Sequence, residues 1–178
     1  MKKFIAIFVI LFLWAYVDIY SNFHKIDNDV YRSGQMNRLN MTAYLKAFDI
    51  KTVLNLRGES KGDWYTYEKN MTFKNDVELV SFDMYSDRYY DYNETATLTN
   101  IIKNAKKPLL IHCIGGADRT SLASALYLFG VKNSSVANAQ KQFAWYYGYW
   151  PSLRPHVLAM GKSFDNYVSK VLREVKKD

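Results

Sequence analysis

Residues 112–120 have the sequence HCIGGADRT, and this stretch decides the expected fold. It holds the only cysteine of the chain, Cys113, six residues before Arg119, with two glycines between them. The apolar residues 109–111 before it predict a buried strand, and residues 120–129 after it predict a helix. A glycine-rich turn between a strand and a helix gathers backbone N–H groups around one concavity that suits an anion. The stretch therefore predicts an anion-binding loop with a nucleophile at its base.

Each residue type in this loop has a physical reason to be there. We expect Gly115 and Gly116 to take positive φ, so that successive N–H groups converge. Cys113 lies at this electropositive site and is expected to ionise to a thiolate, the nucleophilic form. Arg119 offers a planar fork that matches two oxygens of a phosphate. Thr120 places a hydroxyl near the sulfur, where a hydrogen bond would stabilise a departing thiolate.

The pattern His-Cys-x5-Arg-Thr resembles the signature of cysteine-dependent protein tyrosine phosphatases and dual-specificity phosphatases. Residues 30–35 (VYRSGQ) and 53–59 (VLNLRGE) add a closer likeness to small exported bacterial enzymes of the dual-specificity type. This resemblance implies hydrolysis of phosphorylated protein substrates, such as phosphotyrosine, through a phosphocysteine intermediate without a metal or another cofactor. From its place beside Cys113, His112 is expected to be a buried positioning residue rather than a catalytic base. The loop residues expected to contact the substrate are Ile114, Gly115, Gly116, Ala117, Asp118 and Thr120.

Such a reaction needs a general acid, because a tyrosine oxygen departs poorly as an anion. Residues 77–82 predict a strand, and the segment after it is expected to form a flap over the site. Asp83 and Asp87 on this segment are the candidates. Asp87 is preferred because it lies further out on the flap. Asp118 is the third candidate, either as the acid or as one half of a salt bridge that shapes the loop.

Other anion-binding chemistries use a similar loop. Rhodanese and arsenate reductase also place a cysteine in an anion-binding loop, but the Cys113 to Arg119 spacing and the preceding histidine favour a phosphatase. Inositol phosphates or phosphoinositides are alternative substrates, although lipid-directed relatives tend to carry a lysine where Ala117 stands. A phosphate-binding module with weak or no turnover is a further alternative.

The rest of the chain predicts one α/β domain with a central sheet flanked by helices. With the N-terminal segment set aside, residues 21–178 have a usual length for a single domain. The expected strands cover residues 30–32, 52–56, 77–82 and 109–111. The expected helices cover residues 39–48, 64–73, 94–106 with Asn93 as the cap, 120–129, 135–147, and a final segment from Pro155.

Residues 1–20 are expected to be a signal peptide or a signal-anchor. Lys2 and Lys3 precede an apolar run over residues 4–17, a pattern typical of export signals. The positive-inside rule then predicts an exported domain, periplasmic or membrane-anchored and facing outward. A single cysteine excludes an internal disulfide. The net charge of +7 suits an anionic substrate, and with no nucleic-acid-binding motif in the chain, no nucleic-acid partner is expected.

Two features have open interpretations. Arg57, at the end of an expected strand, belongs either to the substrate pocket or to a structural ion pair. The aromatic residues 145–151 (WYYGYWP) either wall the mouth of the site or pack between the last two helices.

Overall fold

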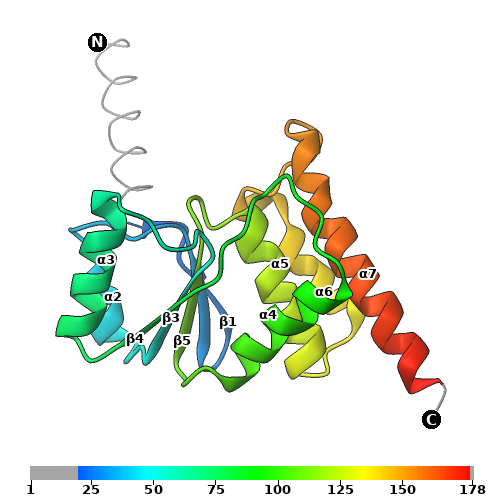
Figure 1. The fold of residues 1–178 in the computed structure, drawn as a ribbon, viewed down its shortest axis with the longest axis horizontal. Helices are drawn as coiled ribbons and strands as arrows, with labels where there is room; N and C mark the ends of the chain where they lie inside the picture. The colour runs from blue at the N-terminus through cyan, green and yellow to red at the C-terminus, as the bar shows by residue number, and fades with distance from the viewer. Residues whose placement is uncertain (1–19, 177–178) are drawn as a thin grey trace, which may run out of the picture.

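A five-stranded sheet forms the centre of the protein in a computed structural model, which describes residues 20–176 (Figure 1). The strand order is β1-β2-β5-β3-β4, and only β1 runs antiparallel to its neighbour. The strands are β1 (His24–Asp27), β2 (Val30–Ser33), β3 (Thr52–Asn55), β4 (Glu78–Ser81) and β5 (Leu109–His112). The expected signal segment falls almost entirely outside the described residues. Within residues 20–176, no helix combines the length and the apolar character that crossing a membrane requires.

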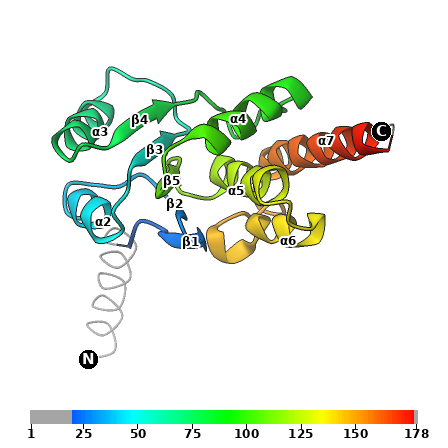
Figure 2. The ribbon, with the colours of Figure 1, turned by 90° about the horizontal axis from the view of Figure 1, so that it is seen from below.

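Helices cover both faces of this sheet, which confirms the predicted α/β architecture (Figure 2). On one face lie α2 (Met41–Ala47) and α3 (Asp63–Lys74). On the other lie α4 (Tyr92–Asn104), α5 (Asp118–Leu126), α6 (Val136–Gln140) and α7 (Leu158–Val175). Alternate residues of β5 enter the two cores, because successive side chains of a strand point to opposite faces. Leu109 and Ile111 pack on the α5 side, and Leu110 packs on the α2 side.

The carboxyl ends of the parallel strands meet at one edge of the sheet. Ser33 of β2 and Asn55 of β3 are both register partners of His112, the last residue of β5. The segments that follow these three strands therefore start side by side. The segment after β5 is residues 113–117, and α5 begins directly after it. This confirms the predicted order of strand, loop and helix.

Three sequence predictions were wrong in detail. Strand β1 was not predicted, because its residues HKID include one apolar side chain at a partly exposed sheet edge. The predicted helix over residues 135–147 is broken: α6 ends at Gln140, two short 3-10 turns follow, and Ala144 between them is extended. The cap of α4 is Asp91 and not Asn93, because Asp91 and Glu94 satisfy each other's backbone N–H groups in a capping box.

Candidate active site

In the loop after β5, the carbonyl groups accept hydrogen bonds from residues around the loop, which fix them so that they point away from its centre. Three consecutive carbonyl oxygens accept such bonds: Ile114 from the N–H of Gln35 at 2.9 Å, Gly115 from Nδ2 of Asn22 at 2.9 Å, and Gly116 from the guanidinium of Arg32 at 2.8 Å. In a trans peptide the next N–H points the opposite way. The amides of residues 115–117 therefore face the inside of the loop, and none of them donates to another group in the described part of the chain. This is the arrangement that binds a tetrahedral oxyanion.

Gly116 makes the tight turn of this loop possible. Its φ is +67°, and a Cβ atom on it would lie 2.5 Å from backbone atoms of Ser33 and Gly34. Gly115 has no positive φ and faces open space. The prediction that both glycines take positive φ is therefore confirmed for Gly116 and wrong for Gly115.

The nucleophile candidate lies beside a buried pair of ionisable groups. Cys113 is 3% exposed, and the neighbouring His112 is 1% exposed. Nε2 of His112 lies 2.9 Å from Oε1 of Glu68 on α3, and Nε2 of Gln35 donates to the same oxygen at 2.9 Å. Burial alone would raise the pKa of Glu68, but the charge of His112 and the contacts with His112 and Gln35 outweigh it, so that this pKa is lowered. His112 is thus buried and held, as predicted.

Arg57 extends the contacts of His112, Glu68 and Gln35 to the surface of the active-site cavity. Its guanidinium donates to Oε1 of Gln35 at 2.8 Å and stacks 3.3 Å from the ring centre of Trp64. Burial, followed by the nearby charge of Arg119, lowers the pKa of Arg57. Of the two interpretations of Arg57, the structure supports the pocket, because its hydrogen-bond partner is a neutral amide and it lines the cavity.

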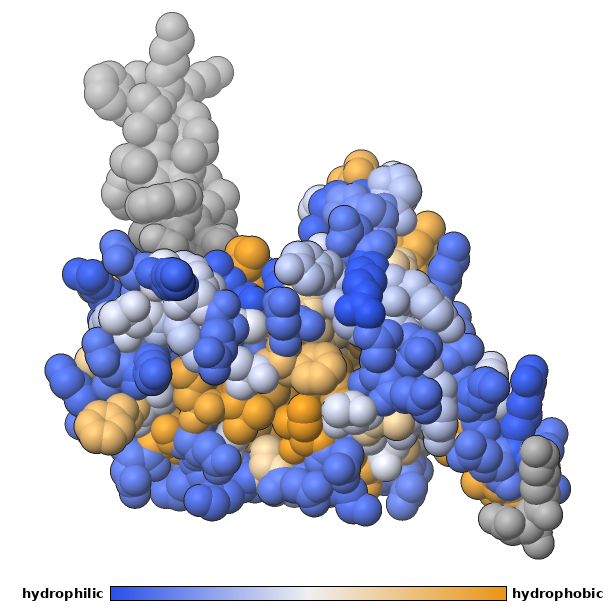
Figure 3. Space-filling model, viewed as in Figure 1, coloured by the Kyte–Doolittle hydropathy of each residue, from blue (hydrophilic) through white to orange (hydrophobic). Residues whose placement is uncertain are grey.

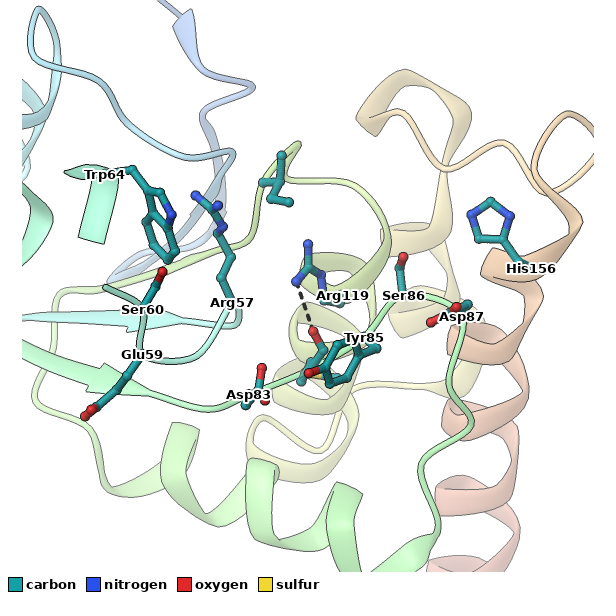
Figure 4. Close-up of a pocket in the computed structure, with 12 residues that line it drawn as sticks. Arg57, Glu59, Ser60, Trp64, Asp83, Tyr85, Ser86, Asp87, Arg119 and His156 are labelled. Atoms are coloured by element: carbon teal, nitrogen blue, oxygen red, sulfur yellow. Dashed lines mark hydrogen bonds between the residues drawn. The ribbon is translucent and has the colours of Figure 1, made fainter. Parts of the chain in front are cut away.

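Arg119 is oriented by the segments after β3 and β4. One guanidinium nitrogen donates to the carbonyl of Met84 at 3.0 Å (Figure 4). The same nitrogen donates to the carbonyl of Leu56 at 3.3 Å. Nε of Arg119 and Oγ1 of Thr120 are buried and have no hydrogen-bond partner among the described residues. Buried donors are normally paired, so these two atoms fit a site that receives an anion.

A cavity of about 530 Å³ opens in front of these groups. Its lining residues come from the segments after β3, β4 and β5, from α3 and α5, and from the start of the last helical region: Arg57, Glu59, Ser60, Trp64, Asp83, Met84, Tyr85, Ser86, Asp87, Ile114, Arg119 and His156. Figure 4 shows Arg57 and Arg119 between Trp64 on one side and Asp87 and His156 on the other. Ile114 lines the cavity, whereas Cys113, Gly116, Ala117 and Thr120 are buried and do not belong to its lining.

Both carboxylates predicted as acids line this cavity. Asp83 lies two residues after the end of β4, and its Oδ1 packs so close to Gly58 that a Cβ on residue 58 would lie 2.7 Å away. Asp87 lies in the turn four residues later and is exposed, with the ring of His156 nearby in Figure 4. The structure therefore brings Asp83 and Asp87 to one site.

Asp118 has a structural partner. Its two carboxylate oxygens each accept a hydrogen bond of 3.0 Å from Arg154. Arg154 also donates to the carbonyl of Gly148 at 2.6 Å. Of the two roles considered for Asp118, the side chain takes the salt bridge that shapes the loop.

Residues of the site that were not singled out from the sequence include Asn22, Glu68, Trp64, His156 and Arg154. For Glu68 a signal existed, because it shares one helical face with Tyr65 and Thr72 at spacings of three and four residues, and all three are buried. His156 and Arg154 follow a segment of irregular backbone, where no periodicity helps. Within residues 20–176, no three His, Cys, Asp or Glu side chains gather in a way that could hold a metal ion.

The sequence of this chain matches one known protein family. A profile described as the tyrosine phosphatase family matches residues 24–138, which is more than half of the chain. The chain belongs to this family and is a cysteine-dependent phosphatase. No curated protein sequence matches it.

Solved structures of phosphatases share this fold. TpbA from P. aeruginosa is similar with a TM-score of 0.64 and 21% identity, over 83% of this chain and 89% of TpbA. A TpbA variant has been solved with pTyr. The core catalytic domain of the PP-IP phosphatase SIW14 from S. cerevisiae has a TM-score of 0.62 and 19% identity, over 87% of this chain and 93% of that domain. PTPMT1 has a TM-score of 0.58 and 17% identity, over 85% of this chain and 99% of PTPMT1.

Substitution of Gly116 by alanine should destabilise the domain. The positive φ and the contact with backbone atoms of Ser33 and Gly34 predict a loss of at least about 2 kcal/mol in the free energy of unfolding, measured in urea. Gly115→Ala is the matched control and should cost less than about 1 kcal/mol, since its Cβ meets open space. Equal losses at the two positions would contradict this account of the turn.

The pair of Glu68 and His112 should make stability depend on pH. Because the folded-state pKa of Glu68 lies below its ordinary value of 4.5, its contribution is complete above that value and is lost as the pH falls through the lowered pKa. Glu68→Gln should therefore cost about 1–3 kcal/mol of unfolding free energy at pH 7 and less at pH 3. Urea unfolding at the two pH values measures this. A cost that does not change with pH would show that the carboxylate charge is not what stabilises the pair.

Proposed function

We propose that this chain hydrolyses phosphotyrosine and related phosphomonoesters of proteins through a phosphocysteine intermediate. The loop carries this proposal: its carbonyls are fixed outward, its amides, Nε of Arg119 and the hydroxyl of Thr120 have no partner among the described residues, and Cys113 lies at its start. The cavity in front is wide enough for an aryl phosphate and has an aromatic wall at Trp64. The pTyr bound to the TpbA variant is consistent with such a substrate.

The reaction has two steps in this proposal. The thiolate of Cys113 attacks phosphorus, the bond between phosphorus and the ester oxygen breaks, and the loop amides with Arg119 stabilise the equatorial oxygens. The leaving oxygen takes a proton from a carboxylic acid. Water then attacks the phosphocysteine and gives up a proton to that carboxylate, which releases inorganic phosphate and the thiolate. The hydroxyl of Thr120 stabilises the departing sulfur.

Asp87 is our proposed general acid. It lies on the rim of the cavity, on the exposed turn after β4, where a short movement of the segment would bring it over a bound ester. Asp83 is the second candidate, since it also lines the cavity.

Inositol phosphates are the second candidate substrates. Two guanidiniums, Arg57 and Arg119, line one cavity, which suits a ligand with more than one phosphate. SIW14, described as a PP-IP phosphatase, has the same fold. Ala117 in place of a lysine argues for the protein substrate.

Export is part of this proposal. Lys2, Lys3 and the apolar run over residues 4–17 support a signal peptide or signal-anchor, which would place the domain of residues 21–178 in the periplasm or on the outer side of a membrane.

Loss of the nucleophile should abolish turnover without loss of the fold. Cys113→Ser should reduce kcat on a phosphotyrosyl peptide to background, because a serine hydroxyl is hardly ionised at this site. Arg119→Lys should lower kcat/KM at least about a hundredfold, because the bidentate contact is lost. The wild-type protein should favour this peptide over inositol hexakisphosphate in kcat/KM. Near-normal turnover by Cys113→Ser would rule out the covalent mechanism, and the opposite substrate preference would favour the second candidate.

The two carboxylates can be separated by the leaving group. If Asp87 is the acid, Asp87→Asn should lower kcat on phosphotyrosine about a hundredfold or more, but far less on an activated aryl phosphate, whose leaving group needs no proton. The limb of the pH profile that reports the acid should disappear. Asp83→Asn is the matched control and should show little dependence on the leaving group. The reverse pattern would assign the acid to Asp83.

A further inference from the structure

Four exposed side chains form an apolar surface beside the active site, which we call the aromatic rim. They are Trp145 at 71% exposure, Tyr146 at 54%, Trp150 at 44% and Leu153 at 68%. Packing between helices, one sequence interpretation of residues 145–151, applies only to Tyr149, which is 7% exposed and contacts Phe143. Large exposed apolar groups that gather in one place usually mark a contact surface.

The aromatic rim is held in shape and does not belong to a loose segment. Nε1 of Trp150 donates to the carbonyl of Trp145 at 2.6 Å, and Gly148, with a φ of +86°, ends the turn between them. Arg154 ties the carbonyl of Gly148 to the carboxylate of Asp118 at the start of α5. The fold therefore keeps these apolar side chains exposed to water, which is unfavourable in free energy. Their burial against a partner would recover that free energy.

The aromatic rim and the catalytic cavity share the anion-binding loop. Ile114 lines the cavity, and the next residue, Gly115, lines a second groove of about 460 Å³ together with Trp145, Tyr146 and Trp150. Figure 1 shows the segment before α7, in orange, projecting beyond the edge of the sheet where this loop lies. The hydropathy colouring of Figure 3 shows apolar atoms at the tip of that projection.

The chain itself brings a second apolar element to this groove. Tyr20, the first described residue, lines this groove together with Gly115 and Trp145. Val17, the last residue of the apolar run over residues 4–17, is three residues before Tyr20, so the chain length limits its distance from Tyr20 to about 11 Å. The apolar run is therefore joined through Tyr20 to the groove that Trp145, Tyr146 and Trp150 line.

We propose that the aromatic rim docks on the surface of a lipid bilayer, so that the catalytic cavity opens beside the membrane. Trp and Tyr favour the headgroup region of a bilayer, because their rings are apolar and their N–H and O–H groups remain hydrated. The run of residues 4–17 is short for the hydrocarbon core and would hold the domain close to the headgroups. The enzyme would then act on phosphate esters borne near the membrane surface.

Spin labels on the full chain test the docking without any catalysis. Cysteine is introduced by Leu153→Cys in a Cys113→Ser background, and Phe73→Cys, at another exposed apolar residue on α3, is the matched control. Vesicles contain phosphatidylcholine and phosphatidylglycerol in equal amounts. On addition of vesicles, collisions with oxygen relative to a water-soluble nickel chelate should rise about twofold or more at residue 153 and not at residue 73. Tyr146→Cys is a second position, should the first variant fold poorly.

The outcomes decide the proposal. No change at residues 153 and 146 on addition of vesicles would overturn it. A label that is shielded from both reagents without vesicles would also overturn it, since the aromatic rim would then be covered by protein, either the segment before Tyr20 or a second copy of the chain.

A second measurement rests on the proposed phosphatase function. A Trp145→Ser, Leu153→Ser double variant should hydrolyse p-nitrophenyl phosphate at the wild-type rate, but should act about tenfold more slowly on an acylated phosphotyrosyl peptide in the same vesicles. If the rate on a soluble phosphotyrosyl peptide falls as much, the aromatic rim binds peptides and the proposal is wrong. If the wild-type protein has no activity on any of these substrates, the proposed function fails while the spin-label result still stands.

Discussion

The structure of the site depends on three hydrogen bonds that fix the carbonyls of residues 114–116 away from the anion. Of the three donors, Arg32 on β2 is the least favourable to bury, because its side chain is charged and fully buried. Burial lowers the pKa of Arg32 to about 10, yet the guanidinium still bonds to Gln142 and Ser121 and stacks 3.8 Å from the ring centre of Tyr147. A buried cation is tolerated only with such partners. The catalytic loop is thus shaped by a charge that never meets the substrate.

How much of this could be predicted depends on how local each interaction is. The motif from His112 to Thr120 is contiguous, so its strand, loop and helix, and the buried position of His112, followed from residue types alone. The two-sided burial of residues 109–111 followed from their apolar run. Glu68 meets His112 only because α3 packs beside the sheet, and Arg154 meets Asp118 only after the chain has passed through α6 and two short turns. Such pairs depend on the tertiary arrangement, which periodicity does not encode.

The segment between α6 and α7 links the exposed aromatic side chains to the helix that carries Arg119. Arg154 joins the turn at Gly148 to α5, so the position of the exposed aromatic side chains is coupled to the first turn of the helix that carries Arg119. Asn22 adds a second link, because its Nδ2 donates to the carbonyls of both Gly115 and Tyr147. The bridge between Arg154 and Asp118 is partly exposed and sensitive to salt, unlike the buried pair of His112 and Glu68.

Arg57 and Arg119 face one cavity, and the charge of Arg119 contributes to the lowered pKa of Arg57. An oxyanion placed between two such cations offsets their repulsion. Because it binds only the folded protein, its binding also raises the free energy of unfolding. Inorganic phosphate, the product of any phosphomonoesterase, carries the same tetrahedral oxygens as the substrate. The cavity that binds the substrate phosphate must therefore also bind inorganic phosphate, so the rate of phosphate release contributes to the overall turnover rate.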